Sequence, residues 1–325
     1  MKKVLAIAAG GYSDEAEISL LSANTVLDNI DLDKFEPILV RILSNKWEAE
    51  YKGSHYLIDK NDFSFQTKER KITFDFVYII IHGTPGEDGK LQAYFDLLAI
   101  PYSSPNHPSS TLTFNKWHCN TILRQLGYNV AASIYLRENQ KYKEQSIVDK
   151  LGLPFFVKPC SAGSSYGVTK VSKTEDLKAA VEYAFQYDEE ILIESELKGR
   201  EITCGVYQNL DHDVIALPIT EIIPEGEFFD FAAKYQGASQ EITPAKISEK
   251  ARVNTQETAK KVYQQLNLRG INRIDFMLVD EVPYIIEINT IPGMTKGSLV
   301  PQQIEAAHIK LEDFFSEIIE GILKK

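Results

Sequence analysis

Four polar residues interrupt the apolar segment RIDFMLVDEVPYIIEINTIPGM, which covers residues 273–294. They are Arg273, Asp275, Glu287 and Asn289. Side chains on a β-strand alternate between two faces, so residues two apart share a face. A three-residue turn at 280–282 would place Asp275 opposite Glu287 and Arg273 opposite Asn289, whereas a two-residue turn would break this register. All four polar groups would then lie on one face of a hairpin.

The same register predicts that Tyr284, Ile286 and Ile288 lie on the opposite face, which packs on the core. Two carboxylates and an amide at cross-strand distance repel one another unless a cation lies between them, and all three offer the hard oxygen ligands that Mg²⁺ takes. The hairpin therefore predicts a magnesium site. The alternative is a solvated hairpin face with one arginine–carboxylate pair, which would require neither Asn289 nor the proline–glycine turn after it.

A loop of small residues lies in KPCSAGSSYGVTK, residues 158–170, between two predicted strands. Gly163, Ser164, Ser165 and Gly167 allow backbone amides to approach a phosphate closely, and Lys158 supplies a positive charge. The loop is not a Walker A motif, because it lacks GxxxxGK[ST] and does not open a helix. A plain hairpin turn is the alternative for this loop taken alone.

Three acidic residues follow a predicted buried strand in ILIESELKGREITCG, residues 191–205. Glu194, Glu196 and Glu201 are expected to be exposed and to accept hydrogen bonds from the adenine and the ribose hydroxyl groups of a nucleotide. Alternatively, they form the solvated end of a strand. The order along the chain, a phosphate loop, a connecting strand and then an acidic hairpin, favours the nucleotide site.

Alternating strands and helices in the first hundred residues predict the elements that position these groups. This pattern is typical of a doubly wound parallel sheet, whose ligands bind at the carboxyl ends of the strands. Two such ends carry the loops AGGYSDEAEISL and HGTPGEDGKLQ. The expected strands cover residues 4–9, 36–43, 74–81 and 100–102, and the expected helices cover residues 16–29 and 91–98.

The rest of the chain predicts two α+β domains, and the domain boundaries are expected at 1–105, 106–199 and 200–325. SSPNHPSS, residues 103–110, is a predicted linker because it is rich in proline, serine and asparagine. Further helices are expected at 113–126, 175–187, 248–266 and the C-terminus. The strands PFFVKP, YGVTKV and EEILIES precede antiparallel strands from residue 201, a long loop at 224–246 and the hairpin.

The composition is that of an ordinary globular protein, with 44% hydrophobic and 25% charged residues. A formal net charge of −11 argues against a general binder of nucleic acid or of anionic membranes. Cys119, Cys160 and Cys204 form no CxxC motif, which favours a reducing compartment and excludes a cysteine-based zinc site. The N-terminal apolar run is too short for a signal peptide, and no run approaches the length of a transmembrane helix. We therefore expect a cytoplasmic protein.

The order of these sites resembles the ATP-grasp superfamily, in which two α+β domains hold ATP and Mg²⁺ between them. Six motifs make the resemblance closer. GGYSDEAEISL, HGTPGEDGKLQ, KPCSAGSSYGVTK, FFDFAAKY, RIDFMLVD and EINTIPGMTKGSLVP are similar, in order, to those of the D-alanine–D-alanine ligase family, and they extend from residue 10 to residue 301. The resemblance implies a Rossmann-like domain followed by the two domains of an ATP-grasp.

The resemblance also implies a nucleotide and metal site. The metal ligands would be Asp275, Glu287 and Asn289, which would hold two Mg²⁺ ions, with Mn²⁺ as a possible replacement, against the phosphates of ATP. Three lysines, Lys116, Lys158 and Lys234, would meet the phosphates or the purine, and the loop of Ser164 and Ser165 would cover them. The segment of Glu194, Ser195, Glu196 and Leu197 would border the adenine, and Glu201 would bind the ribose.

For the amino acids, the resemblance implies that Glu15 binds the ammonium group of the first D-alanine. Ser298 and the amide of Leu299 would bind the carboxylate of the second. Ser164 and Tyr235 would form a hydrogen-bonded chain with Glu15 that positions the incoming amine.

Two further groups complete the implied site. Arg273 and the amide of Gly293 would stabilise the tetrahedral oxyanion, and His82 would lie beside the reacting carboxylate. Simpler alternatives remain open for single residues. Glu15 would be a helix N-terminal residue favoured by the helix dipole, His82 a satisfied histidine at a strand end, and Tyr235 a surface aromatic.

We therefore expect an ATP-dependent ligase that joins two D-alanine molecules for peptidoglycan synthesis, through an acylphosphate. The loop 224–246, with Gly226 and Gly237 as pivots, is the expected lid that excludes water. D-lactate or D-serine as the second substrate is the nearest alternative. Tyr235 favours an amine nucleophile, because the family associates phenylalanine there with ester formation.

Two hypotheses come from other classes of protein. A nucleotide-binding regulator without turnover would not require Glu15, Arg273 and Ser298. A Rossmann oxidoreductase is excluded by the absence of GxGxxG after the first strand. A homodimer is expected from the resemblance alone.

Overall fold

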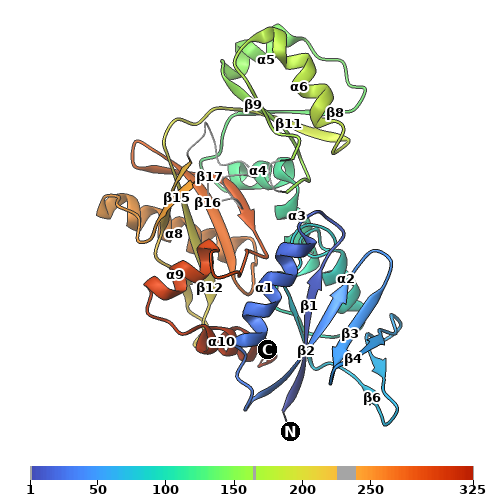
Figure 1. Ribbon diagram of the computed structural model, residues 1–325. Helices are drawn as coiled ribbons and strands as arrows, with labels where there is room; N and C mark the ends of the chain where they lie inside the picture. The colour runs from blue at the N-terminus through green and yellow to red at the C-terminus, as the bar shows by residue number, and fades with distance from the viewer. Residues whose placement is uncertain (1, 164–165, 225–238, 325) are drawn as a thin grey trace.

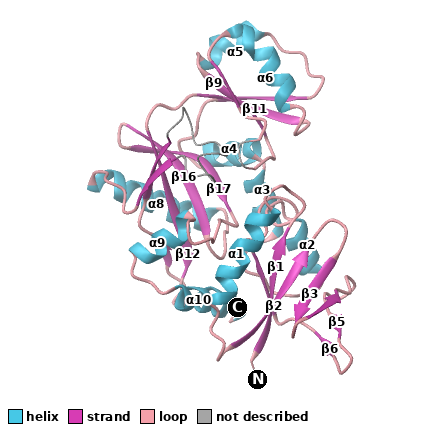
Figure 2. Cartoon of the chain, in the orientation of Figure 1, coloured by secondary structure: helices cyan, strands magenta, loops and turns pink. Residues whose placement is uncertain are grey.

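The computed structural model describes residues 2–163, 166–224 and 239–324 (Figures 1 and 2). The N-terminal part is built on a sheet of strand order β4-β3-β2-β1-β7. The expected parallel core is confirmed, since β1 pairs in parallel with β2 and with β7. The elements of this part are β1 (Lys3–Gly10), α1 (Ala16–Asp28), β2 (Phe35–Ile42), β3 (Trp47–Tyr51), β4 (Ser54–Leu57), β5 (Phe65–Gln66), β6 (Lys71–Ile72), β7 (Phe76–Ile79) and α2 (Lys90–Leu97).

The sheet also has an antiparallel edge, which was not predicted. Strands β3 and β4 add an antiparallel hairpin at one edge. Lys52 and Gly53 form its turn with φ of 50° and 72°, the left-handed conformation that a two-residue hairpin turn requires. The strand expected at 100–102 is reduced to one parallel bridge, between Val77 and Tyr102.

The predicted linker at 103–110 is partly helical, which the sequence analysis did not predict. Helix α3 (His107–Phe114) begins there because the side chain of Asn106 accepts a hydrogen bond of 3.1 Å from the Ser109 amide, and a proline occupies its first turn. The helix expected at 113–126 is interrupted at Asn115. That residue is extended and caps α4 (Lys116–Gln125) by accepting a hydrogen bond from the His118 amide at 3.0 Å.

The central part is a sheet of order β10-β9-β11-β8, antiparallel at every pairing, with α5 and α6 on one side (Figure 1). It has its own apolar cluster, which includes Phe155 and Ile193. The three strands expected here are confirmed, and the helix expected at 175–187 is shorter. The elements are β8 (Ser133–Arg137), α5 (Glu144–Leu151), β9 (Phe155–Pro159), β10 (Thr169–Val171), a 3₁₀ turn (Thr174–Asp176), α6 (Leu177–Ala184) and β11 (Glu190–Ser195).

The C-terminal part is a sheet of order β15-β14-β12-β16-β17, with β13 paired to β12. The segment 224–246 is not a loop throughout, because β15 pairs antiparallel with β14. The predicted pivots Gly226 and Gly237 and the residues Lys234 and Tyr235 lie outside the described residues. The elements are β12 (Arg200–Gln208), β13 (Val214–Ala216), β14 (Thr220–Pro224), β15 (Ser239–Ile242), α8 (Glu249–Gln265), β16 (Asn272–Val279), β17 (Val282–Asn289), α9 (Leu299–Ala306) and α10 (Leu311–Leu323).

The first and last parts of the chain share one apolar core. The ring of Phe315 on α10 meets that of Tyr78 on β7 edge to face, with centroids 5.6 Å apart. Val300 and Ile304 of α9 belong to the same cluster as β1 and β7. Helix α1 lies between the N-terminal sheet and the C-terminal part (Figure 1). The loop after β7 thereby meets the segment after β17, where His82 contacts Ile291.

Candidate active site

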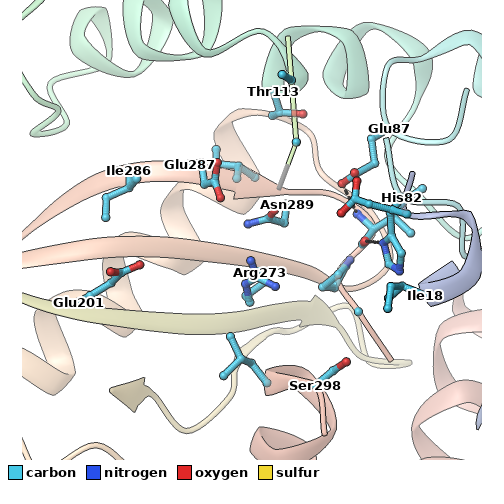
Figure 3. A pocket seen from close by; sticks show the side chains of 18 of the residues that line it. Ile18, His82, Glu87, Thr113, Glu201, Arg273, Ile286, Glu287, Asn289 and Ser298 are labelled. Atoms are coloured by element: carbon cyan, nitrogen blue, oxygen red, sulfur yellow. Dashed lines mark hydrogen bonds between the residues drawn. The ribbon is translucent and has the colours of Figure 1, made fainter. Parts of the chain in front are cut away.

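The hairpin of β16 and β17 has the predicted cross-strand pairs. Arg273 lies opposite Asn289, and Asp275 lies opposite Glu287. Figure 3 shows Arg273, Glu287 and Asn289 on the hairpin, with His82 and Glu87 of the N-terminal part beside its carboxyl end. The polar face of the hairpin is therefore confirmed.

The turn that produces this register differs from the prediction. It has two residues, Asp280 and Glu281, with φ of 47° and 65°, and Val279 pairs directly with Val282. The register survives because the pairing shifts between Asp275 and Phe276, which leaves one extra residue on β17. Our statement that a two-residue turn breaks the register was therefore wrong, because a β-bulge compensates for it.

The bulge also changes which residues face the core. Ile285 is 1% exposed and packs in the core, whereas Ile286 lines the cavity that the polar face borders. Tyr284 is half-buried. The prediction of Tyr284, Ile286 and Ile288 as one core face holds only for Ile288, which is 6% exposed.

Both carboxylate oxygens of Asp275 accept hydrogen bonds from neighbouring side chains. Arg273 donates to both of its carboxylate oxygens, through Nε at 2.8 Å and Nη2 at 2.9 Å. Asn289 donates its amide at 2.9 Å, and the hydroxyl of Thr203 donates at 2.5 Å. Asp275 is buried behind these groups. The arginine–carboxylate pair of the simpler interpretation is therefore present, together with the residues of the predicted metal site.

Carboxylate and amide oxygens on this face are the ligand type that a hard divalent cation takes, although Asp275 does not line the cavity and both of its oxygens accept hydrogen bonds from protein groups. Glu287 and Asn289 line the cavity, and Lys116 Nζ lies 4.0 Å from Glu287 Oε2. Because Asn289 directs its NH₂ group at Asp275, its carbonyl oxygen is the atom that can bind a cation. In the described part of the chain, no three His, Cys, Asp or Glu side chains are grouped to hold a metal. The predicted set has two such residues, so the amide oxygen must complete it.

One cavity of about 1000 Å³ collects most of the predicted site residues from all three parts of the chain. Its volume suits a nucleotide together with small substrates. Ser164, Ser165, Lys234 and Tyr235 lie outside the described residues. The predicted residues that line the cavity are Glu15, His82, Lys116, Lys158, Glu194, Ser195, Leu197, Glu201, Arg273, Glu287, Asn289, Gly293, Ser298 and Leu299.

The nucleotide side of the cavity differs from the prediction in its acidic residues. Glu194 is 6% exposed rather than exposed, because it is bonded to the ammonium group of Lys158 and accepts a hydrogen bond of 2.5 Å from Asn120. Glu196 pairs with Lys170 at 3.0 Å. Lys116 donates to the Ala162 carbonyl at 2.8 Å, which ties helix α4 to the small-residue loop.

Apolar residues on this side were not singled out from the sequence. Phe156 and Val168 of the central part face the cavity together with Met277 and Ile286 of the hairpin. Apolar side chains from two sheets provide a surface for a planar purine. Met277 lies two residues from Asp275 and so shares the polar face by strand alternation, whereas Ile286 reaches this face only through the bulge.

On the amino-acid side, Glu15 stands at the N-terminus of α1, as the helix-dipole alternative also expected. It additionally faces the small-residue loop. A Cβ atom on Gly163 would lie 3.0 Å from Glu15 Oε2, so glycine allows the loop to approach this carboxylate. The expected contacts of Glu15 with Ser164 and Tyr235 lie outside the described residues.

His82 is held at the end of the strand region by one nitrogen. Its Nδ1 lies 2.9 Å from the Ile291 carbonyl oxygen, which places the proton on Nδ1. Its Nε2 is buried without a hydrogen-bond partner among the described residues. Burial lowers the pKa of His82, against the opposing effect of Glu15, and so favours the neutral imidazole. The alternative of a fully satisfied histidine therefore holds for only one of its nitrogens.

Ser298 occupies the N-cap position of α9 without a side-chain hydrogen bond to the helix, and Leu299 is the first residue of α9. Free amides at a helix N-terminus bind carboxylates. The Ser298 hydroxyl lies 2.8 Å from that of Thr295. A Cβ atom on Gly293 would lie 2.8 Å from Ser298 Oγ, so the glycine lets these two loops approach closely.

Glu87 is a cavity residue that the sequence analysis did not identify, although it lies in the motif HGTPGEDGKLQ. Its carboxylate accepts hydrogen bonds from the Gly83 amide at 2.8 Å and from the Ile291 amide at 3.3 Å. Burial raises the pKa of Glu87 to about 7, and the negative charges of Glu15 and Glu287 act in the same direction. The available signal was a carboxylate inside a glycine- and proline-rich loop after a buried strand.

Comparisons with known proteins agree with this geometry. Two family models match, one described as D-ala D-ala ligase N-terminus over residues 4–105 and one as D-ala D-ala ligase C-terminus over residues 122–320. The D-alanine–D-alanine ligase of Flavobacterium johnsoniae is 47% identical over 319 residues, which cover 98% of each chain. Two solved structures, each 30% identical, are similar over nearly their whole length.

The first is the VanG D-Ala:D-Ser ligase from Enterococcus faecalis, with a TM-score of 0.88 and coverage of 99% of this chain and 100% of that one. The second is the D-alanine–D-alanine ligase from Bacillus anthracis complexed with ATP, with a TM-score of 0.79 and coverage of 99% and 98%. These matches confirm the resemblance inferred from the six motifs. The chain belongs to the D-alanine–D-alanine ligase family.

Proposed function

We propose that this chain joins two D-alanine molecules into D-alanyl-D-alanine at the expense of ATP, for peptidoglycan precursor synthesis. The observation that carries the proposal is the arrangement of one cavity, where Glu15, Arg273 and the N-terminus of α9 at Ser298 border the polar face of the hairpin. Binding of a nucleotide alone requires none of these three groups. Membership of the family over nearly the whole chain supports the same function.

The first step activates a carboxylate, which is a poor electrophile. The ammonium group of the first D-alanine binds at Glu15, and one of its carboxylate oxygens takes the γ-phosphoryl group of ATP. An acylphosphate and ADP result. Lys116 and Lys158, which line the nucleotide side of the cavity, neutralise charge on the transferred group, and Lys234 is assigned the same role.

The second step forms the amide. The carboxylate of the second D-alanine binds the Ser298 hydroxyl and the Leu299 amide. Its amine nitrogen, after loss of a proton, attacks the acyl carbon, and the bond from that carbon to the phosphate oxygen then breaks. Arg273 and the Gly293 amide stabilise the oxyanion that forms in between, and arginine keeps its charge among the phosphates.

Several roles complete the proposed site. Ser164 and Tyr235 form, with Glu15, the chain of hydrogen bonds that positions the amine. Ser165 covers the phosphates. The segment from Glu194 through Ser195 and Glu196 to Leu197 borders the adenine, and Glu201 binds the ribose. His82 lies beside the reacting carboxylate.

Asp275, Glu287 and Asn289 are the proposed ligands of two Mg²⁺ ions, for which Mn²⁺ is a proposed substitute. Bound divalent cations supply charge neutralisation for the ATP phosphates. The carboxylate and amide oxygens on the hairpin are the ligand type that such cations prefer.

D-serine is the second candidate for the amine substrate, because the VanG D-Ala:D-Ser ligase is similar to this chain over its full length. D-lactate is less favoured, since Tyr235 stands where ester-forming relatives are expected to have phenylalanine. A catalytically inactive nucleotide-binding regulator is opposed by Glu15, Arg273 and Ser298 within the cavity.

The proposed domains are residues 1–105, 106–199 and 200–325, and the proposed state is a cytoplasmic homodimer. No helix of the structure, over residues 2–163, 166–224 and 239–324, is long and apolar enough to cross a membrane.

The test is phosphate release from ATP and Mg²⁺ with D-alanine, D-serine, D-lactate or L-alanine, with the products identified by mass. We expect release with D-alanine and a product with the mass of the dipeptide. If D-alanine causes no release of phosphate, the proposed function is wrong. Release that requires D-serine together with D-alanine would favour the second candidate.

A further inference from the structure

The turn at residues 291–294, which we call the oxyanion turn, connects the metal hairpin to helix α9 and carries the Gly293 amide. Side chains of the N-terminal part hold it at three points. Ile291 has its carbonyl oxygen 2.9 Å from His82 Nδ1 and its amide 3.3 Å from Glu87 Oε1. The amide of Met294 donates to the Ser22 hydroxyl at 3.2 Å. Both polar groups of the Ile291 backbone are thus bound by one loop that is more than two hundred residues away in sequence.

Glu87 joins this turn to its own loop. Its other oxygen, Oε2, accepts the Gly83 amide at 2.8 Å, immediately after His82. The Glu87 carboxylate therefore holds both the amide of Ile291, at the start of the oxyanion turn, and the amide of Gly83, which follows His82. The loop is packed tightly against the strand region, since a Cβ atom on Gly86 would lie 2.1 Å from the Ile81 carbonyl oxygen.

A purely structural role does not account for the carboxylate at this place. Among the described residues, no cationic side chain forms an ion pair with Glu87, and its charged neighbours include the carboxylates of Glu15 and Glu287. Burial of such a group is costly. A carboxylate is nevertheless the group that accepts two amide protons with two separate oxygens, which glutamine cannot do.

We propose that Glu87 is a positioning residue for acyl transfer, which orients the Gly293 amide toward the oxyanion by holding the Ile291 amide from the N-terminal part. This inference rests on the proposed function. Glu87 acts through the backbone of Ile291 rather than on the substrate. The oxyanion donor is therefore aligned across the boundary between the first and last parts of the chain.

The loss of this alignment affects the second step specifically. If the oxyanion turn is misplaced, the acylphosphate still forms, but attack by the amine slows and water hydrolyses more of it. Misplacement of a catalytic donor lowers the rate by about 10- to 100-fold. This decrease is no larger than the decrease in rate when a donor is removed altogether. Nucleotide binding, which uses the other side of the cavity, is unaffected.

The experiment measures phosphate and dipeptide separately for the full chain with ATP, Mg²⁺ and D-alanine. For Glu87→Gln we expect kcat for the dipeptide to fall about 10- to 100-fold, with phosphate released in excess of dipeptide and KM for ATP within about twofold. Asp88→Asn is the matched control, because Asp88 lies next to Glu87 but pairs with Lys90. It should keep equal amounts of phosphate and dipeptide.

Ser22→Ala tests the same turn from helix α1, and it is independent of how well Glu87→Gln folds. It removes the acceptor of the Met294 amide and should also produce excess phosphate. Equal amounts of phosphate and dipeptide in both variants would overturn the inference while leaving the proposed function intact. A wild-type chain without D-alanine-dependent phosphate release would instead overturn the proposed function, and this inference with it.

Discussion

Glu287→Gln and Asp275→Asn each remove one carboxylate from the hairpin, but the structure predicts different consequences for stability. Asp275 and Arg273 form a buried pair, with side chains 8% and 14% exposed. Removing one partner of a buried pair costs about 3–5 kcal/mol, because the other charge stays buried. Glu287 is 25% exposed, and its contact with Lys116 is 4.0 Å long. A contact of that kind contributes about 0–1 kcal/mol.

The same two variants should be alike in activity. Each removes a proposed metal ligand, and charge stabilisation by a bound divalent cation contributes several kcal/mol to phosphoryl transfer. A loss of about 3–4 kcal/mol corresponds to a kcat that is about 10²- to 10³-fold lower. We therefore expect both variants to be nearly inactive, and only Asp275→Asn to be strongly destabilised.

Urea denaturation in the absence of metal and steady-state kinetics with Mg²⁺ and ATP measure the two effects separately. Glu281→Gln, at the exposed turn of the same hairpin, is the control and should match the wild type in both assays. Turnover of Glu287→Gln within about threefold of the wild type would refute the metal site, since threefold corresponds to less than 1 kcal/mol. Equal stability of Asp275→Asn and Glu287→Gln would refute the assignment of Asp275 as the counter-ion of Arg273.

Three other predictions follow from the same geometry. In the metal-free protein, the pKa of Glu87 is raised from 4.5 to about 7, so the folded state binds a proton more tightly than the unfolded state. The free energy of unfolding of the wild type, relative to Glu87→Gln, should therefore fall by up to about 3 kcal/mol as the pH rises through this range. If urea denaturation gives the same difference between the two proteins at pH 5 and at pH 8, this prediction is wrong. Gly86→Ala should lower the free energy of unfolding by about 1–3 kcal/mol or more, because the added methyl group overlaps the Ile81 carbonyl. Gly297→Ala is the control, because its methyl group meets open space, and it should leave the free energy of unfolding nearly unchanged. Chelation by EDTA should abolish turnover without unfolding the chain, because Arg273 already balances the charge of Asp275. Addition of Mg²⁺ or Mn²⁺ should restore turnover. Loss of the circular dichroism signal with EDTA would contradict the expectation that the chain stays folded.

The polar face of the hairpin was predictable because alternation on a strand is a strictly local rule. The turn was not, since nothing in the run of two isoleucines marks Ile286 as the extra residue of a bulge. The two errors of turn length and bulge cancelled, so the predicted pairs were right although the predicted loop was wrong. The predicted core face was nevertheless wrong, because Ile285 and not Ile286 packs in the core.

Other differences have physical causes that act over longer distances. Asn106 caps α3, and its side chain is a local signal that the serine- and proline-rich composition outweighed in the sequence analysis. Asn115 caps α4, but it lies inside a segment that the apolar pattern predicted as one continuous helix. The edge hairpin of β3 and β4 was missed although WEAEY in β3 alternates apolar and charged residues, because its partner β4, SHYL, is short and mostly exposed. Glu87 could not be assigned from the sequence, because its role depends on Ile291, which lies 204 residues further along the chain.

The C-terminal helix α10 completes the core of the N-terminal sheet, where Phe315 meets Tyr78. During synthesis, the strands of that sheet leave the ribosome long before α10 does. The first part of the chain must therefore remain with an apolar face uncovered until the last helix arrives, which is the period when a nascent protein is most prone to aggregate. The central part, with its own apolar cluster around Phe155, can complete its core in the meantime. The first segment to be made therefore cannot complete its core until the last helix has been made.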